Sequence, residues 1–471
     1  MLEHSSVPPI DAGVLAKLRD IVGGDRVLTD GHDLSRFGTD WTRSVAPRPG
    51  AAVLPGSIEE VQAVVRCAAA HGIAVVPSGG RTGLSAGAVA NRGELVVALE
   101  RLNSIEDFDP IDRTVRCGAG VVTARLQEFA AEHGLFYPVD FAATGSSQLG
   151  GNISTNAGGI RVIRHGMTRD WVAGLKLVSG TGELLDLNRG LIKNNTGYDL
   201  RHLVIGAEGT LGLVVEATMR LCAPPVDHAV MLLGSPDMPA VMSVLAEARS
   251  ALELNAFEFF SESALEKVVS VQHLQRPLET GAAYYALLEF ECADDRTRES
   301  AMRLFERCME QGWVFDGVVS QTIAQADALW RLREDISESI ARWTPYKNDI
   351  STTVSRVPAF LEEVQALVRE SYPDFETVWF GHIGDGNVHL NILKPDGLSA
   401  EEFQRQCETV SERVFRIVER YGGSISAEHG IGLLRKDFLH HSRSALEIDL
   451  MRQIKRAFDP HGIMNPGKIF D

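Results

Sequence analysis

A single hairpin sequence constrains the fold most, because it places a two-residue turn signal between two apolar runs. The run reads Val378-Trp-Phe-Gly-His-Ile-Gly-Asp-Gly-Asn-Val-His-Leu-Asn-Ile-Leu393, with Asp385-Gly386 at its centre. Asp-Gly in this setting is typical of a type I′ β-hairpin. With these two residues as the loop, His382 pairs with His389, and their Cβ atoms lie about 4.5–5.5 Å apart on one face. The hairpin therefore predicts two imidazoles that reach a single metal ion.

Further ligands cannot be fixed by spacing alone. The segment Ser426-Ala-Glu428-His429-Gly-Ile-Gly432 offers a carboxylate and another imidazole. The ordinary roles of such residues are a helix-terminal carboxylate and a hydrogen-bonded interior histidine. A lone histidine in the hairpin would also be read as a core or surface residue. Two histidines in register across an Asp-Gly turn favour a metal site.

Composition and charge limit the class of protein. A chain of 471 residues favours two or three domains, and its net charge of −17 argues against nucleic acid as a partner. A local cationic pocket for an acidic substrate remains compatible with that charge. The six cysteines are scattered without a CxxC pattern, which predicts a reducing compartment. The N-terminus lacks the pattern of a signal peptide, and no apolar run approaches the roughly 20 residues that span a bilayer, so we expect a cytoplasmic protein.

The pattern of elements changes along the chain. Strand and helix patterns alternate from residue 51, with helices expected at Ile58–His71 and Thr123–His133. Residues 138–160 have no periodicity, which in a compact domain indicates a functional loop. Short strands are expected from Trp171 to Leu221. Beyond Ala223-Pro-Pro-Val226 the texture is α+β, with a strand at Tyr284-Tyr-Ala-Leu-Leu-Glu-Phe-Glu-Cys292 and helices at Met238–Leu252, Asp294–Gln311, Thr322–Arg342, Val357–Tyr372, Ala400–Tyr421 and Ala445–Phe458.

Two glycine-rich loops favour a cofactor site. Pro77-Ser-Gly-Gly-Arg-Thr-Gly-Leu-Ser85 follows a strand and fits neither the Rossmann nor the P-loop pattern. Alone, it would be read equally well as a surface turn. A second loop rich in glycine and hydrogen-bonding side chains spans residues 145–159. Two such loops in one domain suit an extended, doubly charged cofactor.

The first half of the chain resembles the FAD-binding domain of the vanillyl-alcohol oxidase/p-cresol methylhydroxylase (PCMH) flavoproteins. The motifs are PSGGRTGLS, GSSQLGGNISTNAGG, His165-Gly166 and KNNTGYDL…GAEGTLG, over about residues 30–222. The resemblance implies an α+β fold, with a two-part PCMH-type FAD-binding domain in residues 1–222, an α+β substrate-binding domain in 223–425, and a short helical C-terminal segment in 426–471 that completes the active site. It implies non-covalent FAD, because no His or Cys stands where some members tether the flavin. The implied FAD-binding residues are Pro77, Ser78, Gly79, Gly80, Arg81, Thr82, Gly83, Leu84, Ser85, Thr144, Gly145, Ser147, Gly150, Gly151, Asn152, Thr155, Asn156, Gly158, Gly159, Gly166, Glu208, Gly209, Gly212 and Asn465.

The second half resembles the D-lactate/D-2-hydroxyglutarate/glycolate dehydrogenase branch through GHIGDGNVHLNI, SAEHGIG and NPGKIF. The resemblance implies that His382, His389 and Glu428 bind a divalent metal, usually zinc, and that His429 is the catalytic base. The implied reaction moves a hydride from substrate C2 to flavin N5. Electrons would then pass to an electron-transfer flavoprotein or a quinone, and a homodimer is compatible with the branch. The implied substrate-binding residues are Arg333, Ser337, Lys347, Asn391 and His429.

The expected cationic side chains rank the candidate substrates. Arg333 and Ser337 are four residues apart and share a face of the expected helix, and Lys347 follows. All three have ordinary readings as solvated residues, but the resemblance to D-2-hydroxyglutarate dehydrogenases implies that the Arg and Lys hold substrate carboxylates. Ser337 departs from the usual Thr. Because of the two cations, D-2-hydroxyglutarate is the leading candidate substrate, with D-malate also considered and D-lactate or glycolate as the alternative. A catalytically idle flavin- or metal-binding subunit is the rival class, and the intact His382, His389, Glu428 and His429 set argues against it.

Overall fold

The computed structural model describes residues 10–471, which form two compact units. The first nine residues, part of the N-terminus considered above for a signal peptide, lie outside the described residues. The first unit contains the chain up to Gly159 together with Met167–Pro224 and Glu428–Asp471, and the second contains Ile160–Gly166 and Pro225–Ala427. The domain boundaries expected after residues 222 and 425 stay predictions.

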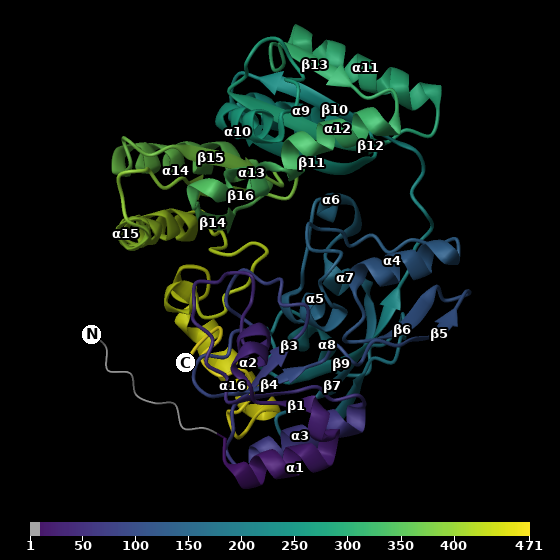
Figure 1. Cartoon of the computed structure of the whole chain (residues 1–471). Coiled ribbons are helices and arrows are strands. Elements are labelled where there is room, and N and C mark those ends of the chain that lie inside the picture. The colour runs from purple at the N-terminus through teal and green to yellow at the C-terminus, as the bar shows by residue number, and fades with distance from the viewer. Residues whose placement is uncertain (1–9) are drawn as a thin grey trace. The chain divides into compact units, whose positions relative to one another are not determined.

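The first unit contains two sheets (Figure 1). In the four-stranded sheet, of order β1-β2-β4-β3, the strands β2, β4 and β3 are parallel and β1 is antiparallel to β2. The second sheet is antiparallel, of order β5-β6-β9-β7-β8. One apolar core includes Val97 from the first sheet and Val178 and Leu213 from the second. The strands are β1 (Val27–Leu28), β2 (Ala51–Val53), β3 (Val75–Ser78), β4 (Leu95–Ala98), β5 (Ile105–Asp109), β6 (Thr114–Gly118), β7 (Val172–Val178), β8 (Leu184–Leu187) and β9 (Leu213–Arg220).

The helices of this unit confirm most of the expected pattern. They are α1 (Ala12–Val22), α2 (Gly31–Phe37), α3 (Ile58–Ala70), α4 (Thr123–Glu132), α5 (Leu149–Thr155), α7 (Thr168–Trp171), α8 (Arg201–Val204) and α16 (Ala445–Phe458), with 3₁₀ turns at Gly24–Arg26 and Lys436–His441. Helix α16 begins at a capping box, in which Ser444 and Glu447 each accept the other's backbone N–H.

The expectation of an irregular loop over residues 138–160 is wrong in part, because α5 lies inside it. Leu149 and Ile153 are four residues apart and fully buried. They are the only large apolar residues of that helix, so the glycines between them conceal its period. The C-terminal segment also extends the first sheet, since the Val75 N–H donates to the Ile463 carbonyl over 2.7 Å.

The second unit is built on one antiparallel sheet of order β13-β10-β12-β11-β15-β16-β14 (Figure 1). Its core includes Phe260, Tyr285 and Phe380 from three adjacent strands, packed with Trp330 and Ile336. The strands are β10 (His228–Ser235), β11 (Leu254–Ser261), β12 (Tyr284–Glu291), β13 (Asp316–Val319), β14 (Tyr346–Ser351), β15 (Thr377–Gly381) and β16 (Asn387–Ile392).

The longer helices predicted in the second unit are present with one exception, whereas the helices at Val162–His165 and Glu262–Gln272 were not predicted. The helices of this unit are α6 (Val162–His165), α9 (Met238–Ala251), α10 (Glu262–Gln272), α11 (Asp295–Glu310), α12 (Ile323–Glu334), α13 (Ile336–Ile340), α14 (Val357–Ser371) and α15 (Ala400–Arg420), with 3₁₀ turns at Ala341–Trp343 and Val354–Arg356. The single helix expected over Thr322–Arg342 is wrong, because a turn at Asp335 divides it. Asp is a weak helix former, and the turn allows Ile336 and Ile340 to join the core.

Within residues 10–471, the structure has no helix that is both long enough and apolar enough to cross a membrane.

Candidate active site

The expected metal ligands come together in the structure. One ligand atom from each of His382, His389 and Glu428 lies within 4.8 Å of the other two. The two imidazole rings are 5.3 Å apart between centroids and nearly perpendicular, at 86°. Glu428 follows Ala427, whose backbone N–H donates to the carbonyl of Asp349 in β14 over 3.3 Å. This bond brings the chain to the edge strand of the sheet just before the carboxylate.

The hairpin that carries the histidines differs from the expected one. Phe380, not His382, is the Cα partner of His389, and a five-residue loop, not a two-residue turn, joins β15 to β16. The loop is held from outside the hairpin, because the Gly384 N–H donates to the Phe257 carbonyl of β11 over 2.9 Å. His382 is the first residue of the loop, so its ring still meets that of His389. The register prediction is wrong, whereas the meeting of the two histidines is confirmed.

A carboxylate lies behind each of these histidines. His382 Nδ1 is 2.8 Å from Glu258 Oε1, and His389 Nδ1 is 3.6 Å from Asp349 Oδ1. The first distance is that of a hydrogen bond, so Glu258 keeps the proton of His382 on Nδ1 and leaves Nε2 as the lone-pair donor to a metal. Asp349 contributes a negative charge near His389. Two imidazoles and one carboxylate are also a donor set of catalytic zinc sites. The residues present therefore fit a divalent metal.

The structure separates the two residues expected on one helix face. Arg333 is 6% exposed, and its guanidinium lies 2.8 Å from Glu258 Oε2 and 4.7 Å from the ring centroid of Phe380. Its Nε has no hydrogen-bond partner among the described residues. Ser337 lies beyond the turn at Asp335 and is exposed. Of this pair, only Arg333 is packed beside a metal-ligand candidate.

Lys347 and Asn391 lie on the face of the sheet that carries His389. Lys347 is the Cα partner of Asn391, and Asp349 is that of His389, so all four side chains share one face. Asn391 is 1% exposed, and its Nδ2 has no partner among the described residues. Lys347 is exposed at its surface, yet the protein around its ammonium desolvates it and lowers its pKa. Because this side chain is exposed, Lys347 is a cation near neutral pH.

His429 lies on a loop that is fixed within the first unit. The N–H groups of Ile431 and Gly432 donate to the two carboxylate oxygens of Glu208 over 2.7 and 2.8 Å. A Cβ on Gly432 would lie 2.0 Å from the Ser85 carbonyl oxygen, so this loop packs directly on the first glycine-rich loop. Burial raises the pKa of Glu208, against the effect of the two N–H donors. Its expected role in binding FAD stays a prediction, because both oxygens have these other partners.

The two glycine-rich loops form one surface. A Cβ on Gly80 would lie 2.3 Å from the Ser146 carbonyl oxygen, and one on Gly79 would lie 3.6 Å from the Gly151 nitrogen. Among the described residues, none comes within 4 Å of the Cβ position of Gly145 or Gly151. Glycine is thus required where the loops meet and leaves open backbone beside the contact. This arrangement fits an extended cofactor that approaches the backbone closely.

Several other residues expected at the FAD site have partners within the protein. Asn152 Nδ2 donates to Thr123 Oγ1 over 2.7 Å, and Ser147 Oγ is 2.8 Å from the same oxygen. Thr155 Oγ1 donates to the Gly151 carbonyl over 3.1 Å. Gly166 belongs to the second unit, unlike the other expected FAD-binding residues. The FAD-binding roles of all these residues stay predictions.

Further residues expected at the FAD site lie in tightly packed turns. Thr144 Oγ1 donates to the Phe141 carbonyl over 2.6 Å, and Asn465 Nδ2 donates to the Glu208 carbonyl over 2.7 Å. Gly209 and Gly212 have positive φ, and a Cβ at Gly212 would lie 2.4 Å from the Val178 carbonyl oxygen. Gly159 is still more crowded, with only 1.9 Å between its Cβ position and the Asp140 carbonyl oxygen.

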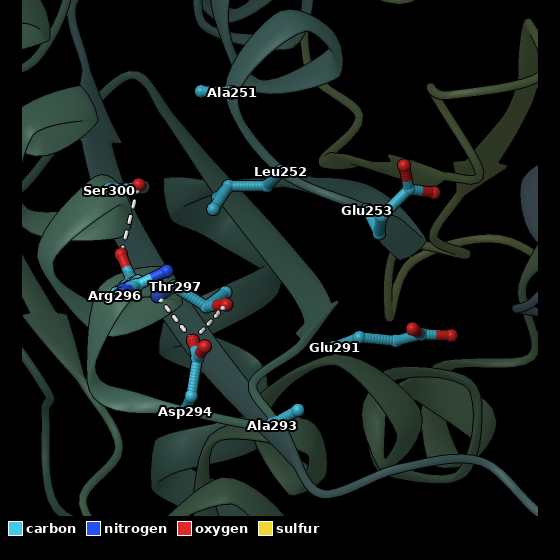
Figure 2. A pocket seen from close by; sticks show the side chains of 9 residues that line it. All are labelled: Ala251, Leu252, Glu253, Glu291, Ala293, Asp294, Arg296, Thr297 and Ser300. Carbon is cyan, nitrogen blue, oxygen red and sulfur yellow. Dashed lines mark hydrogen bonds between the residues drawn. The ribbon is translucent and has the colours of Figure 1, made fainter.

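A surface hollow of about 280 Å³ lies elsewhere in the second unit, beside the start of α11 (Figure 2). Its three carboxylates already have partners. Glu253 and Glu291 accept from Arg164 over 2.6 and 2.8 Å, and Asp294 accepts the Thr297 N–H over 2.9 Å. The lining contains none of the expected site residues, so we do not place the active site there.

Sequence reasoning missed several buried charged groups, among them Glu258, Asp349 and Lys468. Glu258 and Asp349 stand behind the histidines, and Lys468 lies in the first unit with its Nζ 2.8 Å from the Val89 carbonyl oxygen. Burial lowers the pKa of Lys468 to about 8. A signal for Glu258 was present, because it interrupts the apolar run Ala256-Phe-Glu-Phe-Phe260 in the middle of a strand.

Comparison with known proteins identifies the family. The FAD binding domain profile matches residues 49–188, and that of the FAD linked oxidases, C-terminal domain, matches residues 224–469. A D-2-hydroxyglutarate dehydrogenase of Stutzerimonas stutzeri is 58% identical over 98% of this chain and 99% of its own. A second one, of Xanthomonas citri, is 56% identical over 97% of each chain. This chain therefore belongs to the FAD-linked oxidoreductases, in the D-2-hydroxyglutarate dehydrogenase family.

The fold agrees with that of the PCMH flavoproteins. The crystal structure of p-cresol methylhydroxylase with substrate bound aligns with a TM-score of 0.78, at 16% identity, over 98% of this chain and 96% of its own. The expected α+β fold of PCMH type, with an FAD-binding and a C-terminal part, is confirmed.

Proposed function

We propose that this protein oxidises D-2-hydroxyglutarate to 2-oxoglutarate with non-covalent FAD and a divalent metal, zinc by the type of its ligands. The observation that carries the proposal is one face of the second unit's sheet. That face holds His389, Asn391 and Lys347, with Arg333 buried beside the partner of His382. It combines a metal-ligand set with two cations, which is what a hydroxy acid with two carboxylates requires. The names of the two bacterial relatives given above support the same substrate.

The bound cofactors would supply the redox and Lewis-acid chemistry, with FAD accepting the C2 hydride at N5 and the metal polarising the 2-hydroxyl group. The residues His382, His389 and Glu428 would hold the metal. Glycine-rich loops 77–85 and 145–159 would hold FAD through their backbone.

His429 would accept the proton of the substrate 2-hydroxyl. It directly follows Glu428, so the proposed base and a proposed metal ligand are neighbours in the sequence. The Glu208 bonds to Ile431 and Gly432 hold the loop in one conformation. A fixed base within hydrogen-bond reach of its proton contributes about 10²–10⁴-fold to such a step.

Arg333 and Lys347 would hold the carboxylates of the substrate. A distal carboxylate that enters a protein without a cation loses its hydration uncompensated, at a cost of several kcal/mol. Asn391, whose buried Nδ2 has no hydrogen-bond partner in residues 10–471, would donate a further hydrogen bond. Ser337 is exposed and would act only through movement of α13. D-lactate lacks the distal carboxylate, so it would interact with only one of the two cations.

The direct test compares kcat/KM for D-2-hydroxyglutarate, D-malate, D-lactate and glycolate with the purified flavoprotein. We expect D-2-hydroxyglutarate to lead. Replacing Lys347 by Met should reduce kcat/KM for D-2-hydroxyglutarate about 10- to 100-fold, the value of one charge-assisted hydrogen bond, and change that for D-lactate little. Lys394→Met is the matched control, because the Lys394 ammonium donates to the carbonyls of Pro395 and Leu398. A wild-type preference for D-lactate would contradict the proposal.

The proposal also covers the electron acceptor, the cellular compartment and the oligomeric state. Electrons would leave the flavin for an electron-transfer flavoprotein or a quinone, since the scattered cysteines offer no iron–sulfur pattern. We also propose a cytoplasmic enzyme, as the scattered cysteines suit a reducing compartment, and a homodimer is the assembly we would test first.

A further inference from the structure

Glu258 is a buried carboxylate that the reaction described so far does not use. It lies in β11 with 1% of its surface exposed, between Phe257 and Phe259, both of which are also buried. Burying an ionised carboxylate is costly unless it is paired and hydrogen-bonded. Its partners therefore indicate what it does.

The strand register directs Glu258 to the metal-ligand face. Phe259 pairs with Gly381 and Phe260 with Phe380, so one further step along the strand places Glu258 opposite His382. Side chains two apart in a strand share a face, which puts Glu258 on the same face as Phe260 and Phe380. Its Oε1 is 2.8 Å from His382 Nδ1, and its Oε2 is 2.8 Å from Arg333 Nη2.

We propose that Glu258 is a positioning residue for both the metal and the substrate. Through Oε1 it keeps the proton of His382 on Nδ1 and turns Nε2 toward the metal. Through Oε2 it holds the guanidinium of Arg333 against the ring of Phe380. One carboxylate thus sets the distance between the metal and the cation that receives a substrate carboxylate. The proposal rests on the function proposed above.

The competing account is that Glu258 only neutralises a buried arginine. Glu289, on the neighbouring strand β12, provides the comparison. It is equally buried, at 1%, and accepts from Arg161 Nε over 3.0 Å and from Trp330 Nε1 over 2.8 Å. It shares the burial and the arginine partner of Glu258 but bonds to none of the metal-ligand candidates.

The test uses two full-length double variants that differ only in the acceptor facing His382. Both replace Arg333 by Met, and residue 258 becomes Gln in one and Leu in the other. Removing both charges of a buried pair together is often neutral for stability, so both variants should fold. Gln still offers an oxygen to Nδ1–H, whereas Leu does not. Zn²⁺ affinity is then measured by competition with a chelating dye, without substrate.

We expect the Leu variant to bind Zn²⁺ about 10- to 100-fold more weakly than the Gln variant, the usual effect of losing the partner of a metal-bound histidine. Glu289→Gln should bind Zn²⁺ as the wild type does. Equal affinities of the Leu and Gln variants would overturn the proposal. Failure of the wild type itself to bind a divalent metal would overturn the proposed function instead, so the two failures are distinguishable.

The substrate half of the proposal is tested by Glu258→Gln alone. An uncharged amide offers only one acceptor oxygen, so the ion pair with Arg333 or the hydrogen bond to His382 is lost. At saturating Zn²⁺, we expect KM for D-2-hydroxyglutarate to rise about 10-fold more than KM for D-lactate, as for the loss of a hydrogen bond to a charged group. An equal rise for both acids would show that Glu258 does not position Arg333.

Discussion

The two units carry their functional residues in different ways. In the first unit the candidate FAD site is made of backbone, because glycine is required where the loops meet and leaves open space over the backbone beside the contact. In the second unit the site is made of side chains on one face of an antiparallel sheet, and each histidine has a carboxylate behind it. Loss of space should therefore damage the glycine-rich loops most, and loss of charge the sheet face that carries the histidines.

Glu208 and Glu258, two of the buried glutamates, show the same difference. Glu208 accepts two backbone N–H groups and so fixes a loop, whereas Glu258 contacts two side chains and so fixes their functional groups. A loop can be held by any acceptor that satisfies its N–H groups. A metal-binding imidazole needs an acceptor at one particular nitrogen.

The largest effect is expected at His429, on the loop that Glu208 holds. His429→Ala should lower kcat about 10²–10⁴-fold, because it removes the proton acceptor and leaves the metal ligands in place. FAD and Zn²⁺ contents of the variant should equal those of the wild type. The measurement is the rate of anaerobic flavin reduction by D-2-hydroxyglutarate. Rapid reduction in this variant would rule out His429 as the base.

A buried charge in the first unit gives the next effect. Burial lowers the pKa of Lys468 from 10.5 to about 8, so between these values the unfolded chain binds more protons than the folded one. Stability of the wild type should therefore rise with pH across this window, relative to Lys468→Met, by about 3 kcal/mol.

The measurement for Lys468 is the free energy of unfolding of both proteins at about pH 7.5 and about pH 10. The expected size follows because a pKa shift of one unit corresponds to about 1.36 kcal/mol. Titration of other groups cancels in the difference between the two proteins. A difference that does not change with pH would show that the ammonium is hydrated in the folded state.

A smaller effect is expected from a side chain that crowds the contact between the two glycine-rich loops. Gly80→Ala places a Cβ 2.3 Å from the Ser146 carbonyl oxygen and should destabilise the protein without FAD by about 1–3 kcal/mol. Gly145→Ala is the matched control in the second loop, because nothing described lies within 4 Å of its Cβ position. Thermal unfolding of the two variants should separate them. Equal stability would contradict the view that the loops meet through their backbone.

Local patterns in the sequence predicted much of this fold. The apolar period and the caps were sufficient for α3, α4 and α16, and the family motifs identified His382, His389 and Glu428, whose ligand atoms the structure brings together. These features depend on neighbouring residues or on motifs that carry their context with them. The signal for a helix break at Asp335, the low helix propensity of Asp, was weaker, and the break was not predicted.

Contacts between distant segments could not be predicted. The Asp385-Gly386 signal indicated a two-residue turn, but a bond from β11 to Gly384 opens the loop, and nothing near the turn records that bond. Glu208 was expected at FAD from its motif, and its bonds to residues 431 and 432 join segments more than 200 residues apart. Glu258 was visible as a charge in an apolar strand, but its partners depend on the order of the strands.

The most direct test of the central account is flavin reduction before and after removal of the metal. The purified enzyme is treated with a chelator, and its FAD content is confirmed to be unchanged. Anaerobic D-2-hydroxyglutarate should then bleach the flavin slowly or not at all, and Zn²⁺ should restore rapid bleaching, because we propose that His382, His389 and Glu428 hold an ion that polarises the substrate. Bleaching of the metal-free flavoprotein at an undiminished rate would contradict the account.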